Sequence, residues 1–171
     1  MTHQRNDNRI VDKDEARTPP SLFKKLNERF HFKLDAFCTE SNCLCENGLF
    51  KEQYDALNMQ WDSFLVNKFG YRAYSIYGNP PYSHPEPFII KAYEESQKGA
   101  TVVLLLPSDT STKAFHKYVM KATEIIFIEG RVTFNNPDGT PMRSSPKFGS
   151  MVVVFKPGEH ILIVGSMRWK E

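Results

Sequence analysis

The 171-residue sequence lacks an apolar run of the ~18 residues needed to span a membrane, and no signal-peptide pattern opens it. Internal repeats and low-complexity tracts are also missing, which excludes solenoid and fibrous architectures. Neither sign of charge dominates, since 22 Lys and Arg stand against 20 Asp and Glu. Any contact with nucleic acid would therefore have to come from a local basic patch and not from the overall charge. These absences predict a cytoplasmic protein with no membrane partner.

Cysteine is scarce, and the three residues present, Cys38, Cys43 and Cys45, lie close together in the sequence. An odd, clustered set does not form a disulfide framework. A zinc site needs a further ligand near tetrahedral spacing, and neither a C-x-x-C pair nor a nearby histidine supplies one. We expect reduced, inert thiols and no metal, with a structural zinc site as the less favoured alternative.

The remaining composition is that of a globular domain, with 40% hydrophobic and 25% charged residues. Residues 1–17 are polar and of mixed charge, which predicts a flexible tail. Residues 18–171 then leave room for a single domain of roughly 150 residues.

Helix and strand patterns alternate along most of the chain. The helical patterns lie at residues 18–30, capped by Thr18, and at residues 50–57, 88–93 and 110–120, and the strand patterns at residues 32–35, 74–77, 101–106, 125–128, 151–155 and 161–164. The run at 101–106 is apolar throughout, as in strands buried on both faces of a parallel sheet. The Lys-Pro-Gly turn at 156–158 predicts that the last two strands form an antiparallel hairpin. We therefore predict a three-layer α/β fold with a mostly parallel sheet and an antiparallel C-terminal hairpin.

One short motif carries chemistry. Asn79-Pro80-Pro81-Tyr82 follows directly after a predicted strand, and ligands of open parallel sheets bind outside the carboxyl ends of strands. By chance, a polar-Pro-Pro-aromatic tetrapeptide arises in roughly one chain of this length per hundred. A plain Pro-Pro turn between strand and helix is the less favoured interpretation.

This motif resembles the hallmark of the amino-methylating DNA methyltransferases. The surrounding sequence is similar to the small Dam-like adenine-N6 methyltransferases of phages and prophages, in the family order over about residues 18–155. The matching elements are Thr18-Pro19, Phe32-Lys33-Leu34-Asp35, Asn42, Asp55-Ala56-Leu57 with Trp61, and residues 79–83, 105–110, 130–134 and 148–151. The resemblance implies a Rossmann-like methyltransferase fold, S-adenosyl-L-methionine as cofactor, double-stranded DNA as partner, and the bacterial host cytoplasm as location.

The residue types of the motif suit an adenine amine, whose lone pair is delocalised into the ring. Two acceptors on its N–H groups can draw the nitrogen toward a tetrahedral shape. The Asn79 side-chain oxygen and the Pro80 carbonyl are suited to this, because Pro80 and Pro81 fix φ and remove competing donors. Tyr82 offers a face on which the base can stack. Alignment and electrostatics then carry the catalysis, and no metal or strong general base is required.

By the same resemblance, the cofactor lies at the end of the first strand. The implied cofactor-binding residues are Thr18, Pro19, Asp35, Ala36, Phe37, Asn42 and Asp55. The Gly-containing run that the wider family has after its first acid is absent here, as it is in the phage-type members. A structural cap at Asp35 and a solvated helix residue at Asp55 remain the alternatives.

The target adenine lies inside a duplex, so the nucleotide must be flipped into a pocket. Phe148 is the candidate for the second wall of that pocket, with an ordinary core position as the alternative. Arg131, Arg143 and Lys147, in or beside the 135–148 loop, are the candidates for DNA contact, with solvated surface charges as the alternative. A single methyltransferase domain over residues 18–171 leaves no room for a separate target-recognition domain, so loops of this domain must read the DNA sequence. Because these loops are few and short, we predict a short or relaxed recognition site, for which the resemblance suggests GATC.

Two further hypotheses remain. The same motif serves enzymes that methylate RNA base amines or protein glutamine, and an inactive DNA-binding decoy could keep the fold. The matches outside the tetrapeptide favour DNA, and intact Asn79 and Tyr82 argue against a decoy. The oligomeric state stays open.

Overall fold

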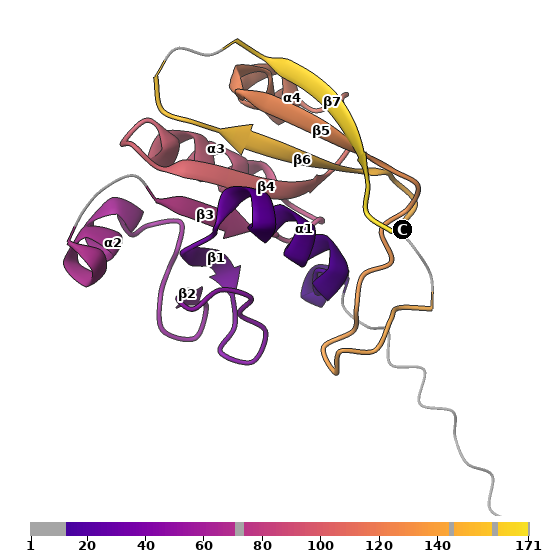
Figure 1. Ribbon diagram of the computed structural model, residues 1–171, viewed down its shortest axis with the longest axis horizontal. Coiled ribbons are helices and arrows are strands. Elements are labelled where there is room, and N and C mark those ends of the chain that lie inside the picture. Colours follow the sequence, from indigo (N-terminus) through magenta and orange to yellow (C-terminus); the bar gives the residue numbers. More distant parts are fainter. Residues whose placement is uncertain (1–12, 71–73, 144–145, 159–160, 171) are drawn as a thin grey trace, which may run out of the picture.

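The computed structural model describes residues 13–70, 74–143, 146–158 and 161–170. Within these residues, seven strands form one sheet with helices on both faces (Figure 1). The helices are α1 (Pro20–Phe30), α2 (Trp61–Phe69), α3 (Glu86–Ser96) and α4 (Lys113–Lys117), with 3-10 turns at η1 (Lys13–Glu15) and η2 (Val119–Lys121). The strands are β1 (Leu34–Cys38), β2 (Gly48–Phe50), β3 (Ser75–Gly78), β4 (Thr101–Pro107), β5 (Glu124–Glu129), β6 (Ser150–Phe155) and β7 (Ile163–Arg168).

The strand order is β2-β1-β3-β4-β6-β5-β7. Strand β6 is antiparallel to both of its neighbours, β4 and β5, and the other pairings are parallel. The predicted α/β fold, with a mostly parallel sheet and an antiparallel element near the C-terminus, is confirmed.

The pairing of the last two strands differs from the expected hairpin. Strand β5 lies between β6 and β7, and β7 pairs with β5 in parallel. The burial of each strand gives the physical reason. Every residue of β6 is buried, so this strand needs a neighbour on each edge, whereas β7 is largely exposed and suits the edge of the sheet.

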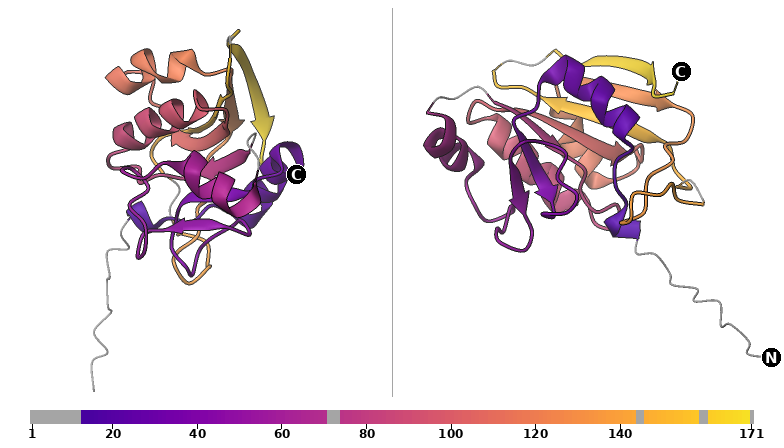
Figure 2. Two further views of the ribbon diagram at one scale, coloured as in Figure 1. Left: turned by 90° about the vertical axis from the view of Figure 1, so that its left-hand side faces the viewer. Right: turned by 60° about the horizontal axis from the view of Figure 1, so that its bottom comes forward.

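The apolar run of β4 forms the centre of two cores. Val102, Leu104 and Leu106 point into the core beneath α2, α3 and α4, while Val103 and Leu105 point into the core beneath α1. Figure 2 shows the sheet between these helices, with α1 on one side and α3 and α4 on the other. Alternate residues of a strand face opposite sides, so a continuous apolar run fits a middle strand covered on both faces.

The region between β1 and β3 departs most from the sequence expectation. Residues 50–57 form no helix: Phe50 ends β2, and Tyr54 packs edge-on against Phe64 of α2. Their helical spacing reflects burial of turn residues under a later helix.

Among the described residues, no helix has the length and apolar character to cross a membrane.

The connections of β1 and β3 create a place for a ligand. These strands are parallel neighbours, and the chain leaves β1 toward β2 on one side but leaves β3 toward β4 on the other. The loops that follow the two strands therefore diverge and leave a crevice at their carboxyl ends, the usual ligand position in such sheets.

Candidate functional site

A cavity of about 920 Å³ opens at this crevice. Cavities of this size hold ligands as large as nucleoside derivatives. Six of the sequence-predicted site residues line it, which are Ala36, Phe37, Asn42, Asp55, Asn79 and Pro81. The structure therefore brings two residues of the predicted motif and four of the seven predicted cofactor residues to one cavity.

Asn79 lies at the edge of this cavity with its two amide ends in different situations. Its Nδ2 donates to the Ala16 carbonyl oxygen at 3.1 Å. Its Oδ1 is buried and accepts no hydrogen bond from the described residues. A buried acceptor without a donor is costly, and such groups recur where a ligand supplies the missing bond. Within the part of the chain that the structure describes, the Asn79 oxygen therefore lacks the N–H donor that a buried acceptor needs.

The rest of the motif is held more deeply. Pro80 is buried, and the Tyr82 ring packs edge-on against Phe134, with ring centroids 5.4 Å apart. Burial raises the pKa of the Tyr82 phenol, and the nearby Ser150 hydroxyl partly offsets this rise. Tyr82 does not line the large cavity among the described residues, so its stacking role stays a prediction.

Asp35 is buried in β1 and follows its first residue, so it does not end the strand as predicted. Its carboxylate accepts hydrogen bonds from the Leu44 amide at 3.2 Å and the Phe37 amide at 3.3 Å. Burial raises the pKa of Asp35 to about 6, although these two amides lower it in part. Asp35 lines a small cavity of about 50 Å³, next to Tyr77 and Asn79, and not the large one.

Thr18 and Pro19 also differ from the expected helix start. Helix α1 begins at Pro20 with Pro19 as its cap, and the cap makes no side-chain hydrogen bond. Thr18 is buried, and its hydroxyl is 2.7 Å from the Tyr77 hydroxyl. Thr18 lines the small cavity, and Pro19 lines neither.

Two polar residues of the large cavity are held by local hydrogen bonds. The Asn42 side-chain oxygen accepts the Thr39 amide at 2.6 Å. The exposed Asp55 carboxylate accepts the Asn58 side-chain amide at 2.7 Å, and this bond lowers the pKa of Asp55. Asp55 thus presents a pre-oriented anion in a turn, not on a helix.

The segment before α1 belongs to the site, which the sequence analysis missed. Asp14, Glu15 and Arg17 line both cavities, although residues 1–17 were expected to form a flexible tail. Polar contacts leave no hydrophobic periodicity, so no pattern in the sequence marked this segment.

The three cysteines are free thiols near the same cavity. A hydrogen bond between the Cys38 and Cys43 side chains raises the pKa of Cys38 and lowers that of Cys43. Both sulfurs pack against Gly48, where a Cβ would lie 2.5 Å from Cys38 Sγ and 2.6 Å from Cys43 Sγ. In the described residues, ligand atoms of Asp35, Cys38 and Cys43 lie within 4.8 Å of one another. The expectation of metal-free thiols stays a prediction.

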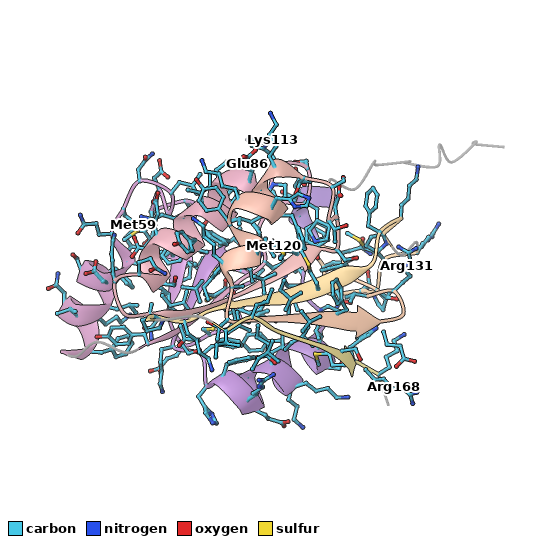
Figure 3. All side chains as sticks on the ribbon, turned by 90° about the horizontal axis from the view of Figure 1, so that it is seen from above. Met59, Glu86, Lys113, Met120, Arg131 and Arg168 are labelled. Atoms are coloured by element: carbon cyan, nitrogen blue, oxygen red, sulfur yellow. The ribbon has the colours of Figure 1, made fainter. Side chains whose placement is uncertain are left out.

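The loop between β5 and β6 lies at the same end of the sheet as the large cavity, next to the segment that precedes α1 (Figure 1). Arg131, Arg143 and Lys147 are all exposed. Arg131 donates to the Lys147 carbonyl oxygen, which joins the start of the loop to its end. Figure 3 places Arg131 at the end of the sheet where the β5 arrow points. Phe148 is 59% exposed, which argues against an ordinary core position.

Comparison with known proteins gives consistent matches. A model of the DNA N-6-adenine-methyltransferase (Dam) family matches residues 6–170. A DNA N-6-adenine-methyltransferase of Haemophilus phage HP1 (strain HP1c1) is 35% identical over 153 residues, covering 85% of this chain and 80% of that protein. A DNA N-6-adenine-methyltransferase of Escherichia phage T1 is 33% identical over 117 residues, covering 68% of this chain but 45% of that protein.

Proposed function

Because the chain belongs to the DNA N-6-adenine-methyltransferase (Dam) family, we propose that it transfers the methyl group of S-adenosyl-L-methionine to the N6 amino group of adenine in DNA. The observation that carries this proposal is the unpaired, buried Oδ1 of Asn79 beside the large cavity. An exocyclic amine supplies the donor that this oxygen lacks. A cytoplasmic location in the bacterial host is part of the proposal, since both relatives come from phages.

In this proposal, the motif holds the amine from two sides. Asn79 Oδ1 accepts one N–H of the adenine amine, and the Pro80 carbonyl accepts the other. The bond from Asn79 Nδ2 to Ala16 fixes which end of the amide faces the substrate. Preorganised acceptors of this kind need no rearrangement at the moment of reaction, which is how electrostatic catalysis operates.

The residues of the cavity fit the implied cofactor in their chemistry. S-adenosyl-L-methionine supplies an activated methyl group on a sulfonium centre. The Asp55 carboxylate can accept ribose hydroxyls, and the T-shaped pair of Phe37 and Phe88, with centroids 4.8 Å apart, offers an apolar wall for the adenine ring. Arg17, whose buried Nε has no partner among the described residues, can bind the cofactor carboxylate. Asn42 and Ala36 also line the cavity.

The proposal includes a flipped adenine and a short or relaxed recognition site, such as GATC. Exposed Phe148 stands two residues before Ser150, whose hydroxyl lies near the Tyr82 phenol, so Phe148 and Tyr82 can flank one base. In this proposal, the exposed Arg131, Arg143 and Lys147 contact phosphates or base edges.

Methyl transfer to defined substrates tests this function. The purified chain and radiolabelled S-adenosyl-L-methionine are incubated with unmethylated duplex DNA, RNA or a protein lysate, and the labelled product is digested and identified. We expect N6-methyladenine from DNA alone. Label in RNA or protein glutamine would favour the alternative substrates, and no label with retained DNA binding would favour an inactive decoy. Long-read sequencing of DNA from expressing cells then gives the recognition site.

The loop residues have a test of their own. Replacing Arg143 and Lys147 with Ala should weaken DNA binding several-fold and reduce its salt dependence by about one counterion per phosphate contact. Lys24→Ala is the matched control, because Lys24 is 79% exposed on α1 and pairs with Glu28. Equal salt dependence of the loop variant and the control would rule out a DNA-binding role for these two residues.

A further inference from the structure

The N-terminal segment (residues 14–17) is hydrogen-bonded to the C-terminal end of the motif loop (residues 79–83). The Asp14 carboxylate accepts two hydrogen bonds from Ser83, the residue that follows the motif. The Ser83 amide donates to Asp14 Oδ1 at 3.0 Å, and the Ser83 hydroxyl donates to Asp14 Oδ2. Hydrogen bonds to a charged acceptor are stronger than those between neutral groups, so this contact is suited to restrain a loop.

The same segment is also hydrogen-bonded to Asn79, at the N-terminal end of the motif loop. The Ala16 carbonyl accepts from Asn79 Nδ2 at 3.1 Å. The segment is itself fixed, because Arg17 and Asn135 exchange two backbone hydrogen bonds of 2.9 Å each. Residues 14–17 therefore connect the motif loop to the β5–β6 loop.

This arrangement meets a need that the prolines leave open. Pro80 and Pro81 fix their own φ angles, but the torsions at Asn79 and Ser83 stay free unless other groups restrain them. A reacting group that shifts by about 1 Å loses much of its rate advantage. Since Ser83 is exposed, water competes for its hydrogen bonds, and a charged partner is needed to keep it in place.

We propose that Asp14 is a positioning residue for methyl transfer, which acts through Ser83 to fix the Asn79 and Pro80 acceptors, a role that rests on the proposed function. Asp14 touches neither the amine nor the methyl group in this role. It sets the geometry of the loop that does.

Kinetics of a double-mutant cycle test the proposal. Asp14→Ala should lower kcat about tenfold, with the affinity for S-adenosyl-L-methionine changed by no more than about twofold. Asp14→Asn, which keeps one acceptor oxygen, should give an intermediate kcat. Ser83→Ala added to Asp14→Ala should cost little more than Asp14→Ala alone, because both remove the same restraint. Asp62→Ala, which removes a carboxylate that binds the Ser63 amide at 2.8 Å, is the matched control.

Amide hydrogen exchange supplies a readout that does not depend on methyl transfer. The Ser83 amide should exchange about tenfold faster in Asp14→Ala than in the wild type, while exchange in β4 stays unchanged. An inactive wild type in which this change still occurs would refute the proposed function but keep the restraint of the loop. Unchanged Ser83 exchange would overturn the positioning role. So would an unchanged kcat in Asp14→Ala, or losses from Asp14→Ala and Ser83→Ala that multiply fully.

Discussion

The two walls of the large cavity satisfy their polar groups differently. On the β1 wall (residues 35–57), acceptors bind donors of the same wall, as Asp35 does with the Leu44 amide and Asn42 with the Thr39 amide. On the β3 wall (residues 78–83), Asn79 binds the N-terminal segment through its donor and keeps a buried acceptor unpaired. The comparison teaches that the β1 wall builds its own shape, whereas the β3 wall keeps capacity for a substrate.

The largest expected effect comes from removing the unpaired acceptor. Asn79→Ala should lower kcat by about 100-fold or more, because a preorganised group is lost where charge develops. The fold and the cofactor affinity should be largely unchanged, since the β1 wall does not depend on Asn79. Steady-state kinetics with calorimetric cofactor titration measure both quantities. Asn67→Ala, on the exposed side of α2, is the control, and near-wild-type activity of Asn79→Ala would refute the difference between the walls.

Asp35 tests the self-contained character of the β1 wall. Its pKa is about 6 in the folded protein against 3.8 for an ordinary aspartate. Between these values, the folded protein keeps a proton that the unfolded chain releases, so stability falls as the pH rises from about 4 to about 6 and levels off above. Asp35→Asn should remove this loss, which amounts to roughly 3 kcal/mol.

Urea unfolding of the wild type and Asp35→Asn at several pH values measures this effect. The difference between their free energies of unfolding should change in favour of the variant as the pH rises toward neutrality. Asn67→Ala, on the exposed side of α2, is the control, because it changes no titratable group. Parallel pH profiles for the wild type and Asp35→Asn would show that burial of this acid does not control the stability of the β1 wall.

Asp55 separates cofactor binding from catalysis on the β1 wall. Asp55→Asn should weaken S-adenosyl-L-methionine binding about tenfold and leave kcat at saturating cofactor within about twofold, because a group that binds ground and transition states alike affects affinity alone. Calorimetry and saturation kinetics give the two numbers. A variant with a reduced kcat and intact affinity would assign Asp55 to the chemistry and erase the contrast with Asn79.

The smallest expected effect concerns the thiols of the β1 wall. A hydrogen bond from Cys38 lowers the pKa of Cys43, while burial raises that of Cys45. Because the thiolate is the nucleophile, limiting iodoacetamide near neutral pH should label Cys43 first. Peptide mass spectrometry identifies the labelled residue, and Cys38→Ala, which removes the donor, should slow the labelling. Faster labelling of Cys45 than of Cys43 would indicate that Cys38 and Cys43 do not share a proton.

The sequence predicted the elements whose burial follows a regular period. Strand β4 was placed correctly because its apolar run is continuous, and helix α3 because apolar side chains repeat along it at helical spacing. The family resemblance is confirmed by the Dam match over residues 6–170. The false helix at residues 50–57 and the misassigned partner of β7 share one cause. The local spacing of apolar residues does not show which distant element buries them. In both cases, the distant element determined the structure.

For the candidate site, the sequence identified groups that chemistry demands. Asn79 and Asp55 were named from their motifs, and the structure places both on one cavity. The N-terminal segment was missed, since Asp14 and Ala16 act through hydrogen bonds that carry no sequence signature. The residue roles themselves stay predictions until the variants are measured.

The insertion of β6 between β4 and β5 has a consequence for synthesis on the ribosome. Strand β4 is complete at Pro107, yet its antiparallel partner begins at Ser150. The nascent chain therefore carries the apolar edge of β4 unpaired until β6, residues 150–155, has emerged. Unpaired apolar edges recruit other chains, so a premature stop before Ser150 should yield aggregates and not a smaller folded enzyme.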